Sequence, residues 1–415
     1  MSVDDSRSGG NANVWATLVG QQRAVTELQR AAAVGRQSPE QAGSGPAGVA
    51  GAMTHAWLIT GPPGSGRSVA ARAFAAALLC DNGGCGVCQS CRSALSGAHL
   101  DVTICRTERL SITVEDVRDL VSKAAMAPVV GRWQVLIVED ADRVTDRAAD
   151  ALLKSLEEPP PRTIWLLCVP NADDMIVTIR SRCREVRLTT PSVDDTIRLL
   201  VGQYGASLGD ATLAARAAQG HIGRAKALAA DKVVRDARQR IVDLPGQWTS
   251  LMACLTSAAE VCATAQAQAE AQTAEMDQSE RRILEDALGF GTKGARPRGV
   301  ASAISSLEEQ QKLRAKRLQR DSIDAVLTEL ASWYRDLLLV QMGGARDGVI
   351  NIAVKDKVDA AAAETTAGQT IRCLQAILHA HQAIEANVPP LLAVEALFVE
   401  LMSRGAAVPL DLDGP

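Results

Sequence analysis

The chain has 415 residues, of which 47% are hydrophobic and only 3% aromatic, and its formal net charge is −4. This length predicts two or three domains with buried cores, and the acidic balance excludes nucleic-acid binding through overall charge, although it is compatible with a local basic patch. The polar first ten residues lack the apolar core of a signal peptide, and no apolar run is long enough to cross a membrane, so we expect a cytoplasmic protein with reduced cysteines.

The first predicted elements are helices that alternate with short apolar strands. Residues 1–12 are expected to be disordered, Gln21 to Gly35 to form a helix, and Gln37 to Met53 to form a loop. Thr113 is expected to cap a later helix together with Asp116, three residues on. Strands are predicted over 56–60, 101–105, 134–138, 163–169 and 185–188. Because strands that alternate with helices form parallel sheets covered on both faces, the first part is predicted to be α/β.

Strand signals fade after Pro191 and the rest of the chain is predicted to be helical, so the fold class is α/β followed by all-α. Amphipathic helices are predicted over Asp321–Met342 and Gln369–Met402, and a flexible loop over Gly289–Gly299. The charged stretch 266–320 has no predicted role. The predicted domains are a disordered N-terminus 1–12, a sheet domain 13–190, a small helical domain 191–245, a larger helical domain 246–405 and a tail 406–415.

The most informative motif is a glycine-rich turn between a predicted strand and a predicted helix. It runs Gly61-Pro62-Pro63-Gly64-Ser65-Gly66-Arg67-Ser68 and matches the phosphate-binding pattern G-x-x-x-x-G-K-[ST], except that Arg67 replaces the lysine. In such loops the backbone N–H groups and the helix N-terminus surround phosphate, and Ser68 would bring its hydroxyl to Mg²⁺. An arginine fork is not equivalent to a lysine point charge. Two interpretations stay open: a loop that binds ATP or ADP with Mg²⁺ but hydrolyses poorly, or an empty structural turn.

Four cysteines follow the helix after this turn. Cys80, Cys85, Cys88 and Cys91 have the spacing C-x4-C-x2-C-x2-C. Four thiolates can surround one Zn²⁺ tetrahedrally, and because no ligand position is left open, the metal would be structural. A disulfide pair is the alternative, which a reducing compartment disfavours. His99 is near enough in sequence to compete as a ligand, but we expect it to be a surface histidine.

Charged residues follow two of the predicted strands. Glu139 and Asp140 end the strand over 134–138, where carboxylates beside a phosphate loop would hold Mg²⁺ and activate water; solvated turn residues are the other interpretation. Arg182 lies in the tripeptide Ser181-Arg182-Cys183, between the fourth predicted strand and the last one. Taken alone, this tripeptide indicates only an exposed or salt-bridged arginine.

Together these parts resemble the bacterial clamp-loader subunits of the AAA+ class, which belong to DNA polymerase III and act in DNA replication. The resemblance covers most of the chain, and the four-cysteine insert directly after the loop's helix is particular to such subunits. The other matching runs are Leu18–Gln22, His55–Gly61, Leu152–Pro160, Thr178–Cys183, Gly220–Leu228 and Asn387–Leu397.

The resemblance implies a fold, partners and residue roles. It implies an AAA+ P-loop domain with a zinc knuckle at 80–91, a helical lid domain, and a helical collar that joins tau/gamma and delta subunits in a hetero-oligomeric ring. Arg182 would be an arginine finger that acts in trans on a neighbour's ATP, and Arg224 would sense nucleotide bound to its own subunit. Through this complex the chain would meet the sliding clamp and primed DNA.

Departures from the family's motor pattern favour a stator-like subunit. Arg67 replaces the loop lysine, Glu139-Asp140 replaces Asp-Glu, and Val169 or Pro170 stands where a polar sensor is expected. We therefore expect the chain's own ATPase to be weak or absent, and polymerase chemistry to lie in another subunit. The alternative is a self-sufficient AAA+ ATPase, either a tau/gamma-like motor or a recombination helicase-like protein. A zinc-dependent nucleic-acid binder is a more distant third hypothesis.

Overall fold

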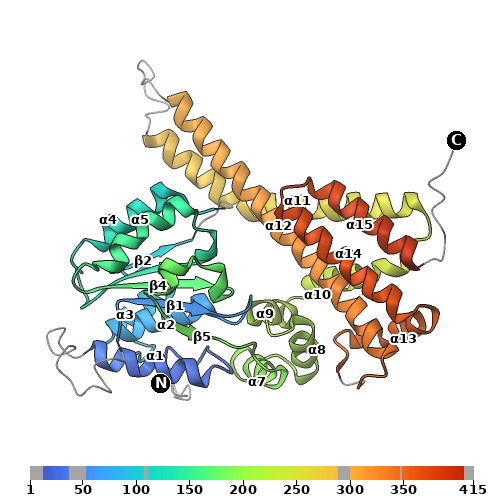
Figure 1. Cartoon of the computed structure of the whole chain (residues 1–415), viewed down its shortest axis with the longest axis horizontal. Helices are drawn as coiled ribbons and strands as arrows, with labels where there is room; N and C mark the ends of the chain where they lie inside the picture. The colour runs from blue at the N-terminus through green and yellow to red at the C-terminus, as the bar shows by residue number, and fades with distance from the viewer. Residues whose placement is uncertain (1–12, 37–52, 107–110, 288–299, 346–347, 406–415) are drawn as a thin grey trace, which may run out of the picture. The chain divides into compact units, whose positions relative to one another are not determined.

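The structure is a computed structural model (Figure 1), and it describes residues 13–36, 53–106, 111–287, 300–345 and 348–405. The predictions for residues 1–12, 37–52, 289–299 and 406–415 lie outside these ranges. The chain divides after Ala230 into two compact units. None of the described helices combines the length and the apolarity that a membrane crossing requires.

A parallel sheet of five strands forms the centre of the first unit, in the order β2-β3-β4-β1-β5. The strand β1 lies between β4 and β5, with Leu58 opposite Leu167 on one side and Glu185 on the other. This architecture confirms the predicted α/β class with a parallel sheet. The strands are β1 (Ala56–Thr60), β2 (Val102–Cys105), β3 (Gln134–Val138), β4 (Thr163–Val169) and β5 (Arg184–Arg187).

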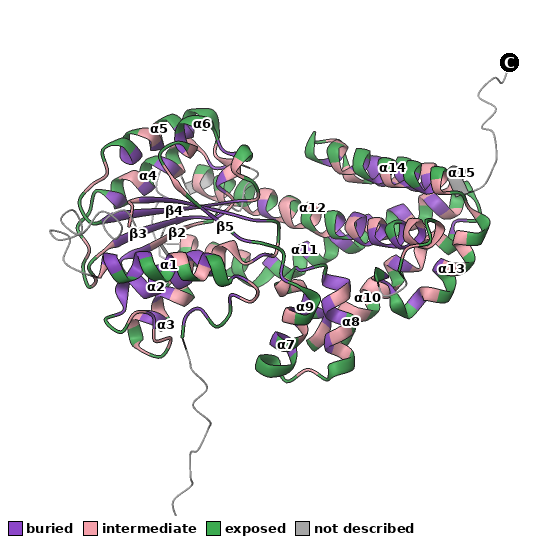
Figure 2. Ribbon diagram, turned by 60° about the horizontal axis from the view of Figure 1, so that its bottom comes forward, coloured by how far each residue is buried: buried purple, intermediate pink, exposed green. Residues whose placement is uncertain are grey.

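Helices cover both faces of this sheet, and the three inner strands β1, β3 and β4 are buried along their whole length (Figure 2). Because successive strand side chains point to opposite faces, Trp57 and Ile59 of β1 join one core while Leu58 joins the other. Trp57 packs edge-to-face against Phe74 at a centroid distance of 5.2 Å. The first face carries α1 (Gln22–Gly35) and α2 (Arg67–Leu79), and the second carries α4 (Val114–Ala124), α5 (Asp146–Glu157) and α6 (Val177–Arg180).

Local sequence signals fix where two of these segments begin. Thr113 caps α4, because its hydroxyl accepts the N–H of Asp116 while the Asp116 carboxylate accepts the N–H of Thr113, as predicted. Asp101, just before β2, is fully buried and its carboxylate accepts backbone N–H groups from 129–131. The hydrogen bonds of Asp101 thus connect the loop after α4 to the start of β2.

The first unit is completed by a short helix after α2 and by three helices after the sheet. The helix α3 (Gln89–Ser96) packs against α2 and carries two of the four clustered cysteines in or beside it. Alanines fill the interior of the last three helices, where Ala211, Ala215 and Ala225 are buried. These helices are α7 (Val193–Tyr204), α8 (Leu208–Ala218) and α9 (Ile222–Ala230).

The second unit is helical in the described ranges, as predicted. Its core contains Trp248 packed on Phe398 at 4.6 Å and Trp333 packed edge-to-face on Tyr334 at 4.9 Å. Residues 369–402 hold two helices rather than one, because Asn387 has a φ of 67° and two prolines follow it. The helices are α10 (Lys232–Val242), α11 (Leu251–Ala287), α12 (Val300–Gln341), α13 (Lys355–Glu364), α14 (Ala367–Glu385) and α15 (Pro390–Gly405).

The helices α11 and α12 form an antiparallel hairpin that contains most of the charged stretch 266–320. Arg314 is nearly buried between them, with Nη1 at 2.7 Å from Asp277 Oδ1 and Nη2 at 2.8 Å from Glu280 Oε1. Hydrogen bonding from Arg314 lowers the pKa of Glu280. This buried cluster aligns the two helices with each other.

Candidate functional site

The glycine-rich turn lies at the carboxyl end of the inner strand β1 and leads directly into α2. Gly64 has a φ of 81°, and a Cβ at this position would lie 2.3 Å from the ring Cγ of His221. The N–H of Ile222 points at the Gly64 carbonyl at 3.4 Å. The loop is therefore covered at its middle by the start of α9, and only glycine fits there.

Arg67 is turned back onto its own loop. Its Nη1 donates to the carbonyl of Gly61 at 2.6 Å, and its Nη2 lies 3.9 Å from Asp140 Oδ1. Only 14% of the side chain is exposed. At the position expected for a polar sensor, the Pro170 carbonyl instead accepts the Gly61 N–H at 3.1 Å. The guanidinium thus joins the loop to the carboxylates after β3.

The carboxylates at the end of β3 are paired with arginines. Glu139 is buried and forms two ion pairs. Its Oε1 lies 2.9 Å from Arg72 Nη2, and its Oε2 lies 3.8 Å from Arg106 Nε. Burial raises the pKa of the nearby Asp142, and the charge of Asp140 adds to this effect. Sequence reasoning missed Arg72 and Arg106. Arg72 could have been predicted from the sequence, because it lies one helical turn after Ser68 and so on the same face of α2.

A cavity of about 600 Å³ lies next to the loop, within the first unit. Ser68, Arg72, Arg106, Glu139, Tyr204 and Lys226 are among the residues that line it. The Lys226 ammonium lies 4.2 Å from the centre of the Tyr204 ring, a cation–π contact. Three cations therefore line this space together with the carboxylate of Glu139.

The two other arginines predicted from the resemblance lie in different settings. Arg224 belongs to α9, where burial lowers the pKa of its guanidinium and its backbone N–H donates to His221 Nδ1 at 3.2 Å. Arg182 follows α6, and the contacts of its exposed side chain come from α5 and α6. Arg224 is next to the loop through the backbone contact with His221, whereas Arg182 is held by α5 and α6. The predicted residues that the structure brings together at the loop are Gly61, Gly64, Gly66, Arg67, Ser68, Glu139 and Asp140.

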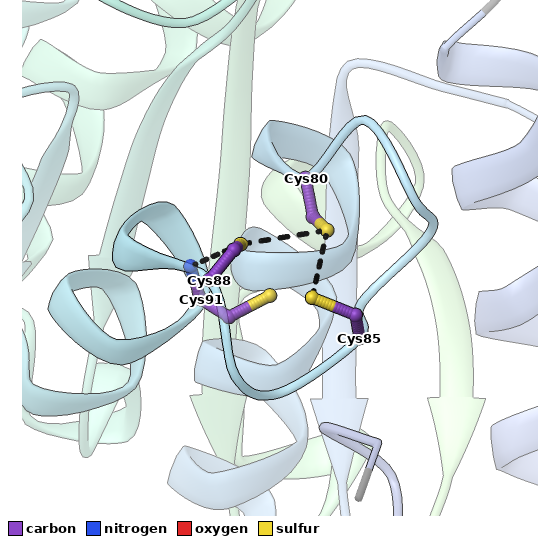
Figure 3. Close-up of side chains that lie close together, drawn as sticks. All are labelled: Cys80, Cys85, Cys88 and Cys91. Carbon is purple, nitrogen blue, oxygen red and sulfur yellow. Dashed lines mark hydrogen bonds between the residues drawn. The ribbon is translucent and has the colours of Figure 1, made fainter.

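The four cysteines form one cluster, with their sulfurs turned toward one another (Figure 3). The Cys80–Cys85 and Cys80–Cys88 sulfur distances are both 3.7 Å, and all four sulfurs lie within 4.8 Å of one another. Tetrahedral zinc, with Zn–S bonds of about 2.3 Å, separates its ligand sulfurs by about 3.8 Å. A disulfide requires about 2.05 Å. The donor set and its spacing fit a structural zinc ion.

The surroundings of the cluster also favour a thiolate. Burial opposes ionisation of Cys80, but backbone N–H groups of Cys85, Gly84 and Asn82 outweigh it and lower the pKa of Cys80 to about 6. Burial raises the pKa of Cys91, which lies on α3. His99 stands outside the cluster, and the prediction that it is a surface residue is wrong. His99 is buried, and its Nδ1 accepts the N–H of Asp101. This hydrogen bond closes the turn before β2.

Comparison with known proteins gives similarity over part of the chain. Residues 48–192 match the family model described as DNA polymerase III, delta subunit. DNA polymerase III subunit delta' of Pseudomonas aeruginosa is 36% identical over 152 residues, which cover 35% of this chain and 46% of that protein. DNA polymerase III subunit tau of Escherichia coli is 32% identical over 185 residues, which cover 43% of this chain and 26% of that protein.

The matched relatives are thus covered only in part, about a quarter of the tau sequence and less than half of the delta' sequence. Among solved structures, a gamma subunit-related protein of Thermotoga maritima is 15% identical, with a TM-score of 0.39 over 85% of this chain and 96% of that chain.

Proposed function

We propose that the protein is the delta-prime subunit of a bacterial clamp loader, because residues 48–192 match the family model described as DNA polymerase III, delta subunit, and a relative named delta' matches part of the chain. In this role it is a stator-like member of a ring with tau/gamma and delta subunits. It supplies Arg182 to a neighbour's ATP site while that ring loads the sliding clamp onto primed DNA. The single observation that carries the proposal is that Arg67, in place of the loop lysine, is turned back onto its own loop and donates to the Gly61 carbonyl.

The contacts around the loop support a subunit without ATP turnover of its own. His221 covers the middle of the loop, and Arg67, which stands where a lysine would reach phosphate, donates to the Gly61 carbonyl instead. The metal-binding carboxylate expected after β3 is paired with Arg72 instead. These residues do not fit ATP with Mg²⁺ in the manner of a hydrolytic site, and we assign no catalytic step to this loop.

The position of Arg182 supports the finger role. It is exposed, with 36% of its side chain accessible, and lies at the end of α6 rather than at its own loop. An arginine finger supplied by a neighbour stabilises the charge that develops on the transferred phosphoryl group, an effect of about 10³–10⁵ in rate. A residue that serves another subunit needs this kind of exposure.

The main alternative is a tau/gamma-like motor subunit. Relatives named tau and delta' match this chain at similar identity, so identity alone does not choose between the two subunits. The choice rests on Arg67 and on the arginine-paired Glu139, because a motor needs a free loop and a free carboxylate to bind and cleave ATP. The four-cysteine knuckle would be structural in either subunit, so it does not distinguish between them.

The proposal is tested in a complex reassembled from this chain and the tau/gamma and delta subunits of the same source. Arg182→Ala should lower steady-state ATP turnover by as much as about 10³-fold in the pocket that this arginine serves. Complex formation, followed by size-exclusion chromatography, should not change. Arg180→Ala is the matched control, because Arg180 lies two residues away and pairs with Asp173. Equal turnover in the two variants would rule out the finger role.

A further inference from the structure

The guanidinium of Arg182 is held in one orientation by its own chain. Its Nη2 lies 2.5 Å from Glu157 Oε1, at the last residue of α5. Its Nη1 donates to the Thr178 carbonyl at 2.8 Å and to Ser181 Oγ at 3.3 Å. Both terminal nitrogens therefore have partners on the chain.

These contacts leave part of the guanidinium available. An arginine side chain carries five N–H donors in a planar fork. The three contacts engage the two terminal nitrogens, so the Nε–H and one Nη2 hydrogen lie outside them. About a third of the side chain is exposed, and Nε and Nη2 share one edge of the guanidinium, the kind of edge that binds two oxygens of a phosphoryl group.

The place of Glu157 is not explained by the stability of its own helix. A carboxylate in the last turn of a helix faces the negative end of the helix dipole, which disfavours it. Glu157 and the adjacent Glu158 both lie at this end of α5, where Pro159 and Pro160 follow. Glu157 offsets its unfavourable position by pairing with Arg182, whereas Glu158 is simply exposed.

We propose that Glu157 is a positioning residue for Arg182. It fixes the guanidinium so that the two remaining N–H groups point outward together and meet the neighbour's phosphoryl group already oriented. A pre-oriented arginine loses less side-chain freedom when the phosphoryl group binds. Glu157 itself touches no reacting atom. The inference rests on the proposed finger role of Arg182.

The test is a set of variants in the reassembled complex, with kcat and KM for ATP measured for each. Glu157→Ala should lower kcat roughly 10-fold and leave KM nearly unchanged, because a misplacement of about 1 Å at the reacting group slows the chemical step. Glu157→Gln keeps an acceptor oxygen at the same reach and should restore most of the rate. Glu157→Asp keeps the charge but is one methylene too short, so it should behave like Ala. Glu158→Ala is the matched control and should match the unmodified complex.

Two further measurements separate this inference from the finger role itself. The double variant Glu157→Ala with Arg182→Ala should be no slower than Arg182→Ala alone, because the glutamate acts only through the arginine. Thermal unfolding of each variant checks that the chain is folded. If Arg182→Ala lowers turnover while Glu157→Ala does not, the positioning role is wrong and the finger role stands. The same conclusion follows if Glu157→Asp restores the rate and Glu157→Gln does not. If Arg182→Ala has no effect, the finger role itself fails.

Discussion

Asp101 shows how a single buried charge organises one end of the sheet. Its side chain has no exposed surface, and its carboxylate accepts the backbone N–H groups of Val129, Val130 and Gly131. Burial favours the neutral acid, but these N–H donors outweigh it and lower the pKa of Asp101. The loop before β3 is therefore held by one anion.

Asp101→Asn should destabilise the first unit by about 2–3 kcal/mol, because an amide replaces a charged acceptor and turns its own N–H groups toward N–H donors. Since the pKa of Asp101 is lowered on folding, its contribution is complete above about pH 4 and is lost as the pH falls through the folded value. The difference between the two proteins should thus shrink in acid. Denaturant unfolding at several pH values measures it, with the exposed Asp119→Asn as the control. A difference that grows in acid would contradict this sign.

Single residues also mark the limit of what the sequence predicts about the site. The motif identified Arg67 and the strand-end carboxylates, because both occupy fixed positions in a known pattern. It gave no indication that His221, more than 150 residues after Gly64, covers the loop. Arg106 and Glu157 were missed for the same reason, since their partners Glu139 and Arg182 are contacts made by the tertiary fold.

At the scale of elements, the four-cysteine knuckle contains one short helix, α3, which packs against α2. The helix α3 has only eight residues, and among them Cys91 and Ala94 are buried. A helix this short is marginal without tertiary support. Structural zinc contributes roughly 10–16 kcal/mol to small zinc-binding peptides, far more than such a helix supplies. The metal is therefore expected to fix the fold of residues 80–97.

Cys88→Ser should remove the bound zinc and unfold the knuckle while the sheet stays folded. The hydroxyl is a poor ligand, and Cys88 also caps α3 by accepting the N–H of Cys91. Elemental analysis gives the metal content, and hydrogen exchange over residues 80–97 reports the local unfolding. Cys105→Ser, a cysteine on β2 outside the cluster, is the control and should keep one zinc per chain. A Cys88→Ser chain that retains zinc would exclude this ligand set.

The elements themselves were predicted unevenly. Strands such as Gln134–Val138 were found because a buried parallel strand is a continuous apolar run bounded by polar residues. The capping box at Thr113 was found from two residues three apart. The break between α14 and α15 was not, because the amphipathic pattern continues across it and only the backbone at Asn387 shows the turn.

At the scale of the whole molecule, the chain presents one exposed arginine and one phosphate loop that is contacted by its own side chains. Arg182 is exposed and oriented, whereas the loop after β1 is engaged by Arg67 and covered by His221. Under the proposed function, such a subunit would contribute to ATP turnover only as a member of an assembly. The isolated chain should accordingly show no ATP hydrolysis of its own.

Steady-state ATP turnover of the reassembled complex, compared between Arg67→Ala and Arg182→Ala, separates the two parts of the molecule. Arg67 contacts Gly61 of its own loop and Asp140 at the end of β3, so its loss should leave turnover within about twofold of the unmodified complex. Arg182→Ala should lower turnover strongly. Loss of turnover in Arg67→Ala with normal turnover in Arg182→Ala would show that this chain uses its own loop, and would contradict the proposed function.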